Sequence, residues 1–228
     1  MRSALALLHL LSSWAMSAHA SPWAQEEGGL YARVAWADET IDSIAADRTD
    51  IYAELGLGDG YTVTGKIERV DYAEADRFDT TAWRTTLRRQ VFRRSGFVGS
   101  VEFGALQGAA IGGRMGCDRL GMEGRVSVGW SGELRNTQSF SFVEVATRQH
   151  EACYRNRIEF GLGRKAMDEL WLVTQVWLER GDKDALSNKT QTDLVWTGGQ
   201  VDLTLSYREE FSGAFEERGV VISLSRQY

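Results

Sequence analysis

Histidine and cysteine, which often carry acid–base, nucleophilic or metal chemistry, are scarce beyond residue 20. His150 is the only histidine in that part of the chain, with Glu151 beside it and Cys153 nearby. A metal site would need further ligands close by, and a catalytic base would need a nucleophile and an orienting partner. We expect His150 to be an exposed residue of an outside loop, and Ser139 and Ser141 lie toward the other end of the expected strand before it. We therefore predict no catalytic residue, no metal ligand, no cofactor and no enzyme activity.

The glycine-rich residues 108–113 are the one stretch that could cradle a phosphate group. Phosphate-binding loops end in a lysine followed by serine or threonine and lead into a helix, and this stretch has neither feature. Its small residues suit an ordinary loop instead. The acidic residues 74–79 could bind divalent cations weakly, although a solvated loop is the simpler interpretation. Neither segment indicates an enzyme. The function therefore has to be inferred from the predicted fold.

The N-terminus has the layout of a secretory signal peptide at residues 1–20. Arg2 precedes an apolar run at residues 4–11, and small residues occupy positions 18 and 20, as at a cleavage site. The apolar run is far shorter than the ~20 residues of a membrane-spanning helix. We therefore expect export from the cytoplasm and cleavage before Ser21.

The mature chain is expected to consist of an N-terminal lead at residues 21–28 and one β-barrel domain at residues 29–228. The single proline, Pro22, falls in the lead, and no linker-like stretch divides the rest. Loss of Arg2 changes the formal charge from -6 to about -7. An acidic chain lacks the basic surface that nucleic acids require, so we expect no nucleic-acid partner.

From Gly29 onward, apolar and polar residues alternate with a period of two, which predicts strands with two different faces rather than helices. We count about twelve such runs. The 24 glycines are spread through these runs, which suggests places where neighbouring side chains approach closely. The expected strands lie at residues 30–36, 51–57, 61–68, 83–88, 97–105, 122–130, 139–148, 157–163, 170–179, 190–196, 201–208 and 219–228.

The connections between these runs differ in length. Links after the even-numbered strands are tight, as at residues 58–60 and 197–199, whereas links after the odd-numbered strands are longer, as at residues 37–50. We therefore predict that short and long links strictly alternate. This rhythm is typical of an up-and-down barrel with short turns at one end and longer loops at the other.

The last ten residues carry the clearest signal. Val220, Ile222 and Leu224 alternate with polar or smaller residues, and the chain ends on Tyr228. This pattern resembles the closing strand of Gram-negative outer-membrane β-barrels. The resemblance implies an all-β, up-and-down antiparallel transmembrane barrel in the outer membrane, in contact with outer-membrane lipid and inserted by the barrel-assembly machinery.

If the apolar faces meet lipid, the charged faces line a lumen and the aromatic residues near strand ends form girdles at the membrane interfaces. The acids and bases are roughly balanced and can pair across strands, which favours a narrow or closed pore with little ion selectivity. The predicted girdle residues are Trp36, Trp83, Trp130, Trp196, Tyr207 and Tyr228. The predicted lumen-facing charges are Arg33, Glu54, Lys66, Glu68, Arg84, Arg88, Glu102, Glu123, Arg125, Glu144, Arg148, Arg157, Glu159, Asp202 and Arg208.

Three functions fit this pattern. The first is a passive or gated pore for small solutes, and the second is a non-conducting envelope protein that acts through its loops. The third is a soluble periplasmic β-barrel binding module, because alternation alone does not say whether an apolar face meets lipid or protein. The solute, the oligomeric state and any loop partner are not specified by the sequence.

The only two cysteines, Cys117 and Cys153, flank the expected hairpin centred near Asn136. Counted outward from that centre they lie almost opposite each other, and residues opposite on paired strands are close enough for a disulfide. An exported chain also meets an oxidising compartment. We therefore predict a Cys117–Cys153 bridge between two loops at the rim, with two free thiols as the alternative.

Overall fold

The computed structural model describes residues 22–108, 119–151, 153–182, 186–213 and 215–228. Within these ranges no helix is long and apolar enough to cross a membrane. A 3-10 helix spans Asp76–Phe78. The strands are β1 (Leu30–Ile41), β2 (Ile44–Gly58), β3 (Tyr61–Tyr72), β4 (Thr80–Arg94), β5 (Phe97–Gln107), β6 (Gly121–Leu134), β7 (Thr137–His150), β8 (Tyr154–Met167), β9 (Leu170–Gly181), β10 (Leu186–Trp196), β11 (Asp202–Gly213) and β12 (Glu217–Gln227).

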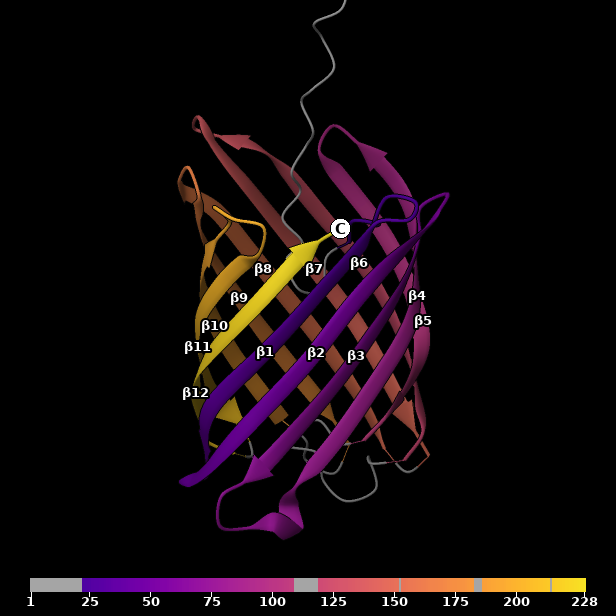
Figure 1. Cartoon of the computed structure of the whole chain (residues 1–228). Coiled ribbons are helices and arrows are strands. Elements are labelled where there is room, and N and C mark those ends of the chain that lie inside the picture. The colour runs from indigo at the N-terminus through magenta and orange to yellow at the C-terminus, as the bar shows by residue number, and fades with distance from the viewer. Residues whose placement is uncertain (1–21, 109–118, 152, 183–185, 214) are drawn as a thin grey trace, which may run out of the picture.

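The strands close into one antiparallel barrel in chain order (Figure 1). β1 pairs with β12 from Tyr31 opposite Gln227 to Ile41 opposite Glu217. The Tyr228 N–H extends this seam by donating to the Leu30 carbonyl at 2.8 Å. Full closure leaves no unpaired strand edge, which a membrane-spanning sheet requires. The predicted up-and-down barrel of about twelve strands is confirmed.

The two ends of the barrel differ. The start of β1, the C-terminus and the links β2–β3, β4–β5, β6–β7, β8–β9 and β10–β11 lie at one end, which we call the terminal rim. The other six links lie at the opposite end, the loop rim, where the β3–β4 link with its 3-10 helix is seen at the bottom of Figure 1. In barrels of this kind the short turns face the periplasm.

The prediction of strictly alternating link lengths is wrong. Residues 37–50, expected as a long loop, continue β1 and β2 to a two-residue turn at Asp42 and Ser43. Both turn residues have positive φ, 48° and 69°, which matches the twist of a tight hairpin. Conversely, the β10–β11 link at residues 197–201 is longer than the β7–β8 link at residues 151–153.

The outer surface of the barrel is apolar. Large aliphatic and aromatic side chains on alternate positions of every strand are exposed, while their neighbours are buried. The soluble alternative, in which these faces pack against each other as a core, is therefore wrong. The exposed apolar residues include Leu30, Val34, Ile51, Leu55, Val63, Ile67, Leu87, Val101, Phe103, Val126, Val128, Val143, Val145, Ile158, Phe160, Leu172, Leu194, Leu203, Leu205, Val220, Ile222 and Leu224.

The predicted girdle residues all lie on this outer surface. Trp36, Trp83, Trp196, Tyr207 and Tyr228 are exposed. The sixth, Trp130, is half-buried, and its ring lies against Gly96 in the β4–β5 turn and Gly132 on its own strand.

Replacing Leu224 with arginine tests the lipid-facing surface. Leu224 lies on the outward face of β12, halfway between Val220 and Tyr228, and is opposite Val34 and Leu203 on the neighbouring strands. Arginine at the bilayer midplane is expected to destabilise the folded barrel by about 2–4 kcal/mol, against about 0–1 kcal/mol for Val201→Arg near the terminal rim. Urea titration of both variants in lipid vesicles measures the difference. Equal costs at the two positions would contradict the assigned membrane band.

Candidate functional site

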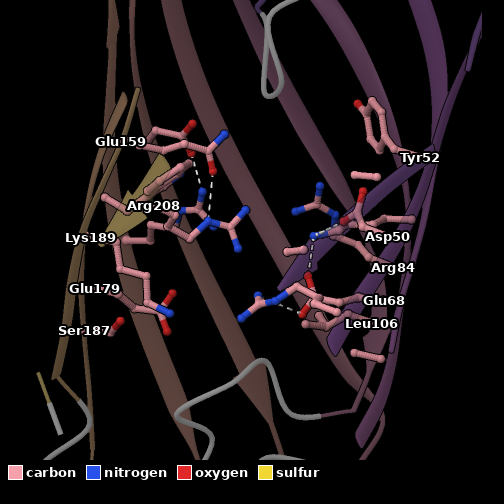
Figure 2. A pocket seen from close by; sticks show the side chains of 18 of the residues that line it. Asp50, Tyr52, Glu68, Arg84, Leu106, Glu159, Glu179, Ser187, Lys189 and Arg208 are labelled. Atoms are coloured by element: carbon pink, nitrogen blue, oxygen red, sulfur yellow. Dashed lines mark hydrogen bonds and ion pairs between the residues drawn. The ribbon is translucent and has the colours of Figure 1, made fainter. Parts of the chain in front are cut away.

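A cavity of about 250 Å³ occupies the half of the lumen toward the loop rim, and all twelve strands contribute to its wall. Figure 2 shows part of this wall: Glu159, Glu179, Lys189 and Arg208 face Asp50, Glu68 and Arg84 across the cavity. Basic side chains outnumber acidic ones on the wall. The basic residues are Arg33, Arg48, Lys66, Arg84, Arg125, Arg148, Arg155, Arg157, Lys189 and Arg208, and the acidic residues are Asp50, Glu68, Glu159 and Glu179.

The structure places all fifteen predicted lumen charges on the inward-facing positions of their strands. Glu179 and Asp193, on the same expected polar faces, also point inward. Sequence reasoning missed other inward charges of the described strands, because they fall on strand ends that were expected to be loops. They include Glu39, Arg48, Asp50, Arg155, Lys189, Glu210 and Glu217.

A series of buried ion pairs follows the inner wall of the barrel from β2 to β7. The Arg88 guanidinium contacts Glu54 and Glu102, with both N–O distances at 2.9 Å. Glu102 lies 3.8 Å from Arg125, which in turn contacts Glu144 at 2.8 Å. These five side chains are at most 4% exposed. Removing one partner of such a pair leaves an uncompensated buried charge. These five side chains therefore hold strands β2, β4, β5, β6 and β7 together.

The same network continues toward the loop rim through Glu123. This carboxylate accepts from Arg84 at 3.2 Å and also pairs with Arg148. Arg148 reaches Glu179 at 3.6 Å, and Glu179 accepts from Arg155 at 2.8 Å. Strands β4, β6, β7, β8 and β9 are therefore joined by side chains as well as by their backbones.

A second network spans the seam between the first and last strands. Arg48 contacts Glu39 at 2.8 Å and Glu217 at 3.1 Å. Arg208 also reaches Glu39, at 3.3 Å, while Lys189 pairs with Glu217. β1 and β2 are thus tied to β10, β11 and β12 by charge on the inner side of the barrel.

In the network at the seam the acids lie behind the bases. The side chains of Glu39 and Glu217 are 0% exposed, whereas Arg208 and Lys189 are 19% and 14% exposed. Although acids and bases are roughly balanced, the surface that a solute in the cavity meets is mostly guanidinium and ammonium.

The described part of the lead, residues 22–28, lies inside the barrel toward the terminal rim. The backbone N–H of Gln25 donates to Thr62 Oγ1 at 2.9 Å, and its side-chain amide donates to Glu54 Oε2 at 2.6 Å. Arg88 Nη1 donates to a backbone carbonyl of the lead at 3.1 Å. Polar side chains of β2, β3 and β4 therefore hold this segment from the lumen wall.

An apolar cluster fixes the same segment from the opposite wall. The ring of Trp23 meets Phe140 edge-on, with centroids 6.2 Å apart, and Phe140 lies 5.9 Å from Trp171. Phe142 and Val173 complete the cluster. The inner face of the barrel is therefore apolar here, next to the charged stretches of the wall.

Two glycines make room for the lead. A Cβ added at Gly129 would come within 2.5 Å of Pro22 Cγ, and one at Gly56 would collide with the Glu26 carbonyl oxygen. Pro22 is fully buried as a result. The lead is thus fitted to the barrel wall and fills the lumen at the terminal rim, while the cavity occupies the other half.

His150 is not the exposed loop residue that its sequence position suggested. It is the last residue of β7 and is buried, and its Nδ1 lies 2.8 Å from the Arg119 carbonyl oxygen. In the described ranges no group of three or more histidine, cysteine, aspartate or glutamate side chains has the geometry of a metal site.

The predicted signal peptide and disulfide involve residues outside the described ranges. Residues 1–20 are not described, and neither is Cys117, whereas Cys153 is buried at the β7–β8 link. The signal peptide and the Cys117–Cys153 bridge stay predictions.

No model of a known protein family matches this sequence, and no curated protein matches it either. Solved structures do match the fold. An outer-membrane channel from Pseudomonas putida F1 superposes with a TM-score of 0.62 at 8% identity, over 93% of this chain and 100% of the other. The NanC porin gives 0.59 at 9% identity, over 85% and 98%. A KdgM porin in complex with disordered oligogalacturonate gives 0.58 at 8% identity, over 85% and 98%.

At these identities the likeness concerns the fold. The chain has the closed β-barrel fold of these channels and porins, and its apolar outer surface has the character of a lipid-facing one.

Proposed function

We propose that this chain forms a narrow pore for small solutes and that residues 22–28 close it at the terminal rim. The observation that carries the proposal is the charged cavity inside a closed barrel with an apolar exterior. A structural barrel would have no need of a cavity, because side chains alone can fill the interior of a small barrel. The similar structures named as porins and as a channel support the same interpretation.

Closure by the lead makes the pore gated rather than permanently open. The lead is held by hydrogen bonds to the barrel wall and by one aromatic cluster, and its covalent link to the barrel is at the start of β1. Such a segment can leave the lumen without breaking a single strand pair. The barrel itself therefore does not have to rearrange when the pore opens.

The proposed function involves the two partners that the sequence predicted. Outer-membrane lipid contacts the apolar exterior, and the barrel-assembly machinery inserts the strands. No nucleic acid and no cofactor takes part in the proposed function, and no enzymatic step is needed for it.

A second candidate is a non-conducting envelope protein that acts through its loops. The filled lumen at the terminal rim favours it, because an obstructed barrel passes no solute. The two candidates differ in whether the lead ever leaves the lumen.

Planar-bilayer recording of the mature chain tests the proposal. We expect discrete, small conductance steps interrupted by long closures, and no steps from a heat-denatured sample. If neither the mature chain nor a variant without residues 22–27 conducts, while both migrate as folded barrels on unheated gels, the non-conducting candidate is correct.

A further inference from the structure

One part of the cavity wall combines an indole ring with two guanidinium groups. Trp177 on β9 faces inward and lines the cavity. Arg157 Cζ lies 5.6 Å from the centroid of its ring, and Arg208 Cζ lies 6.0 Å from it. Gln175, two residues earlier on the same strand, also lines the cavity. We call these four residues the Trp177 patch.

The Trp177 patch holds hydrogen-bonding atoms that the protein does not use. The side-chain amide of Gln175 is buried, and neither its nitrogen nor its oxygen has a partner among the described residues. The same holds for Trp177 Nε1 and for Arg157 Nε. Buried polar atoms are normally paired, so unpaired ones beside a cavity indicate a place for a ligand or for ordered water.

The arginines are already positioned for a ligand. Arg157 pairs with Glu159 through Nη2. Arg208 donates from Nε to Gln191 Oε1 at 2.9 Å and from Nη1 to Glu39 at 3.3 Å. Each guanidinium is held from behind by these bonds, which lowers the conformational entropy lost when it binds an anion.

The unused atoms define the chemistry of the ligand. Planar guanidinium groups match the geometry of a carboxylate, and an indole N–H needs an acceptor. A carboxamide needs both an acceptor and a donor, and a hydroxyl group supplies both. We propose that the Trp177 patch binds a small carboxylate that also carries hydroxyl groups. The inference rests on the proposed function, because the solute must enter the lumen to reach the patch.

Other solutes fit less well. The cavity wall carries more basic than acidic side chains, so a cation would be repelled. A neutral sugar could satisfy Gln175 but would leave the guanidinium donors without an anion. Inorganic phosphate has the charge, but it carries no hydroxyl-bearing chain that could pair with the amide while the guanidinium groups hold the anion.

Isothermal titration of the mature chain in detergent tests the proposal without relying on conductance. The probes are gluconate, glucose and inorganic phosphate. We expect gluconate to bind more tightly than either of the others. Arg157→Lys keeps a positive charge beside Glu159 but loses the planar fork, and it should weaken gluconate binding about tenfold. Trp177→Phe keeps a ring and removes the N–H, and it should weaken binding about threefold to tenfold.

Arg218→Lys is the matched control, because Arg218 is exposed on the outward face of β12, and it should bind gluconate like the unaltered chain. Unheated gels verify that each variant is folded. The proposal is overturned if gluconate does not bind, if glucose or phosphate binds as tightly, or if folded Arg157→Lys and Trp177→Phe bind gluconate unchanged. Gluconate binding without conductance would instead overturn the pore and leave the patch intact.

Discussion

Deleting residues 22–27 is expected to convert rare, small openings into a persistent, larger conductance. The deletion removes the segment that fills the lumen at the terminal rim and leaves every strand pair in place. Gln25 no longer bonds Thr62 and Glu54, and the apolar ring of Trp23 no longer covers Phe140. Single-channel recording in planar bilayers measures both the unit conductance and the open fraction.

A graded version of the same experiment uses Trp23→Ala. Truncating a packed tryptophan costs about 3–5 kcal/mol, and 1.4 kcal/mol corresponds to a factor of ten. The ratio of open to closed time should therefore rise by roughly a hundredfold or more. Phe78→Ala is the control, because Phe78 is exposed on the β3–β4 link far from the lead. Closure times that stay the same in the Trp23 variant and in the deletion would show that the lead does not gate the barrel.

Replacing Arg125 with glutamine is expected to destabilise the folded barrel by about 3–5 kcal/mol, because it leaves buried carboxylates without their cation. Arg125 contacts Glu123 at 2.6 Å and Glu144 at 2.8 Å, and it lies 3.8 Å from Glu102. Its side chain is 2% exposed, so water does not replace the lost partner. Urea titration in detergent, followed by tryptophan fluorescence, measures the free energy of unfolding.

The control for this prediction is Arg119→Gln. Arg119 pairs with Glu151 at 2.6 Å, but their side chains are 67% and 66% exposed, and exposed pairs contribute about 0–1 kcal/mol. If both variants lost the same small amount of stability, the inner network would not be holding the wall together.

The sequence predicted the barrel because lipid and lumen impose opposite demands on neighbouring residues. On β12, Ile222 is exposed on the apolar exterior and Ser223 is buried on the inner side, and this contrast recurs along every strand. Where the strands extend beyond the membrane, alternate residues no longer differ in polarity. Asp38 and Asp47 occupy outward positions opposite each other on β1 and β2, so hydropathy no longer alternates although the backbone pairing continues. The strand ends and their inward charges were missed for that reason.

The sequence indicates only weakly that the lead lies inside the lumen. Phe140 and Phe142 share the inward face of β7 with Glu144, which is unexpected for a wet lumen. Opposite them on β8, Gly163 and Gly161 leave room for the two rings. Apolar rings on an inward face indicate that something apolar covers them. The sequence does not say what covers them, because the contact joins residues far apart in the chain.

The position of the lead also constrains how the molecule is made. β1 follows the lead directly and pairs with β12, the described strand most distant from it in the chain, so the cylinder stays open along one side until these two strands pair. Contacts of such wide sequence separation form late. The lead can therefore enter sideways, through the open flank, before the wall is complete. The barrel would then close around the lead, and no second protein would be needed to block the lumen of a newly inserted barrel.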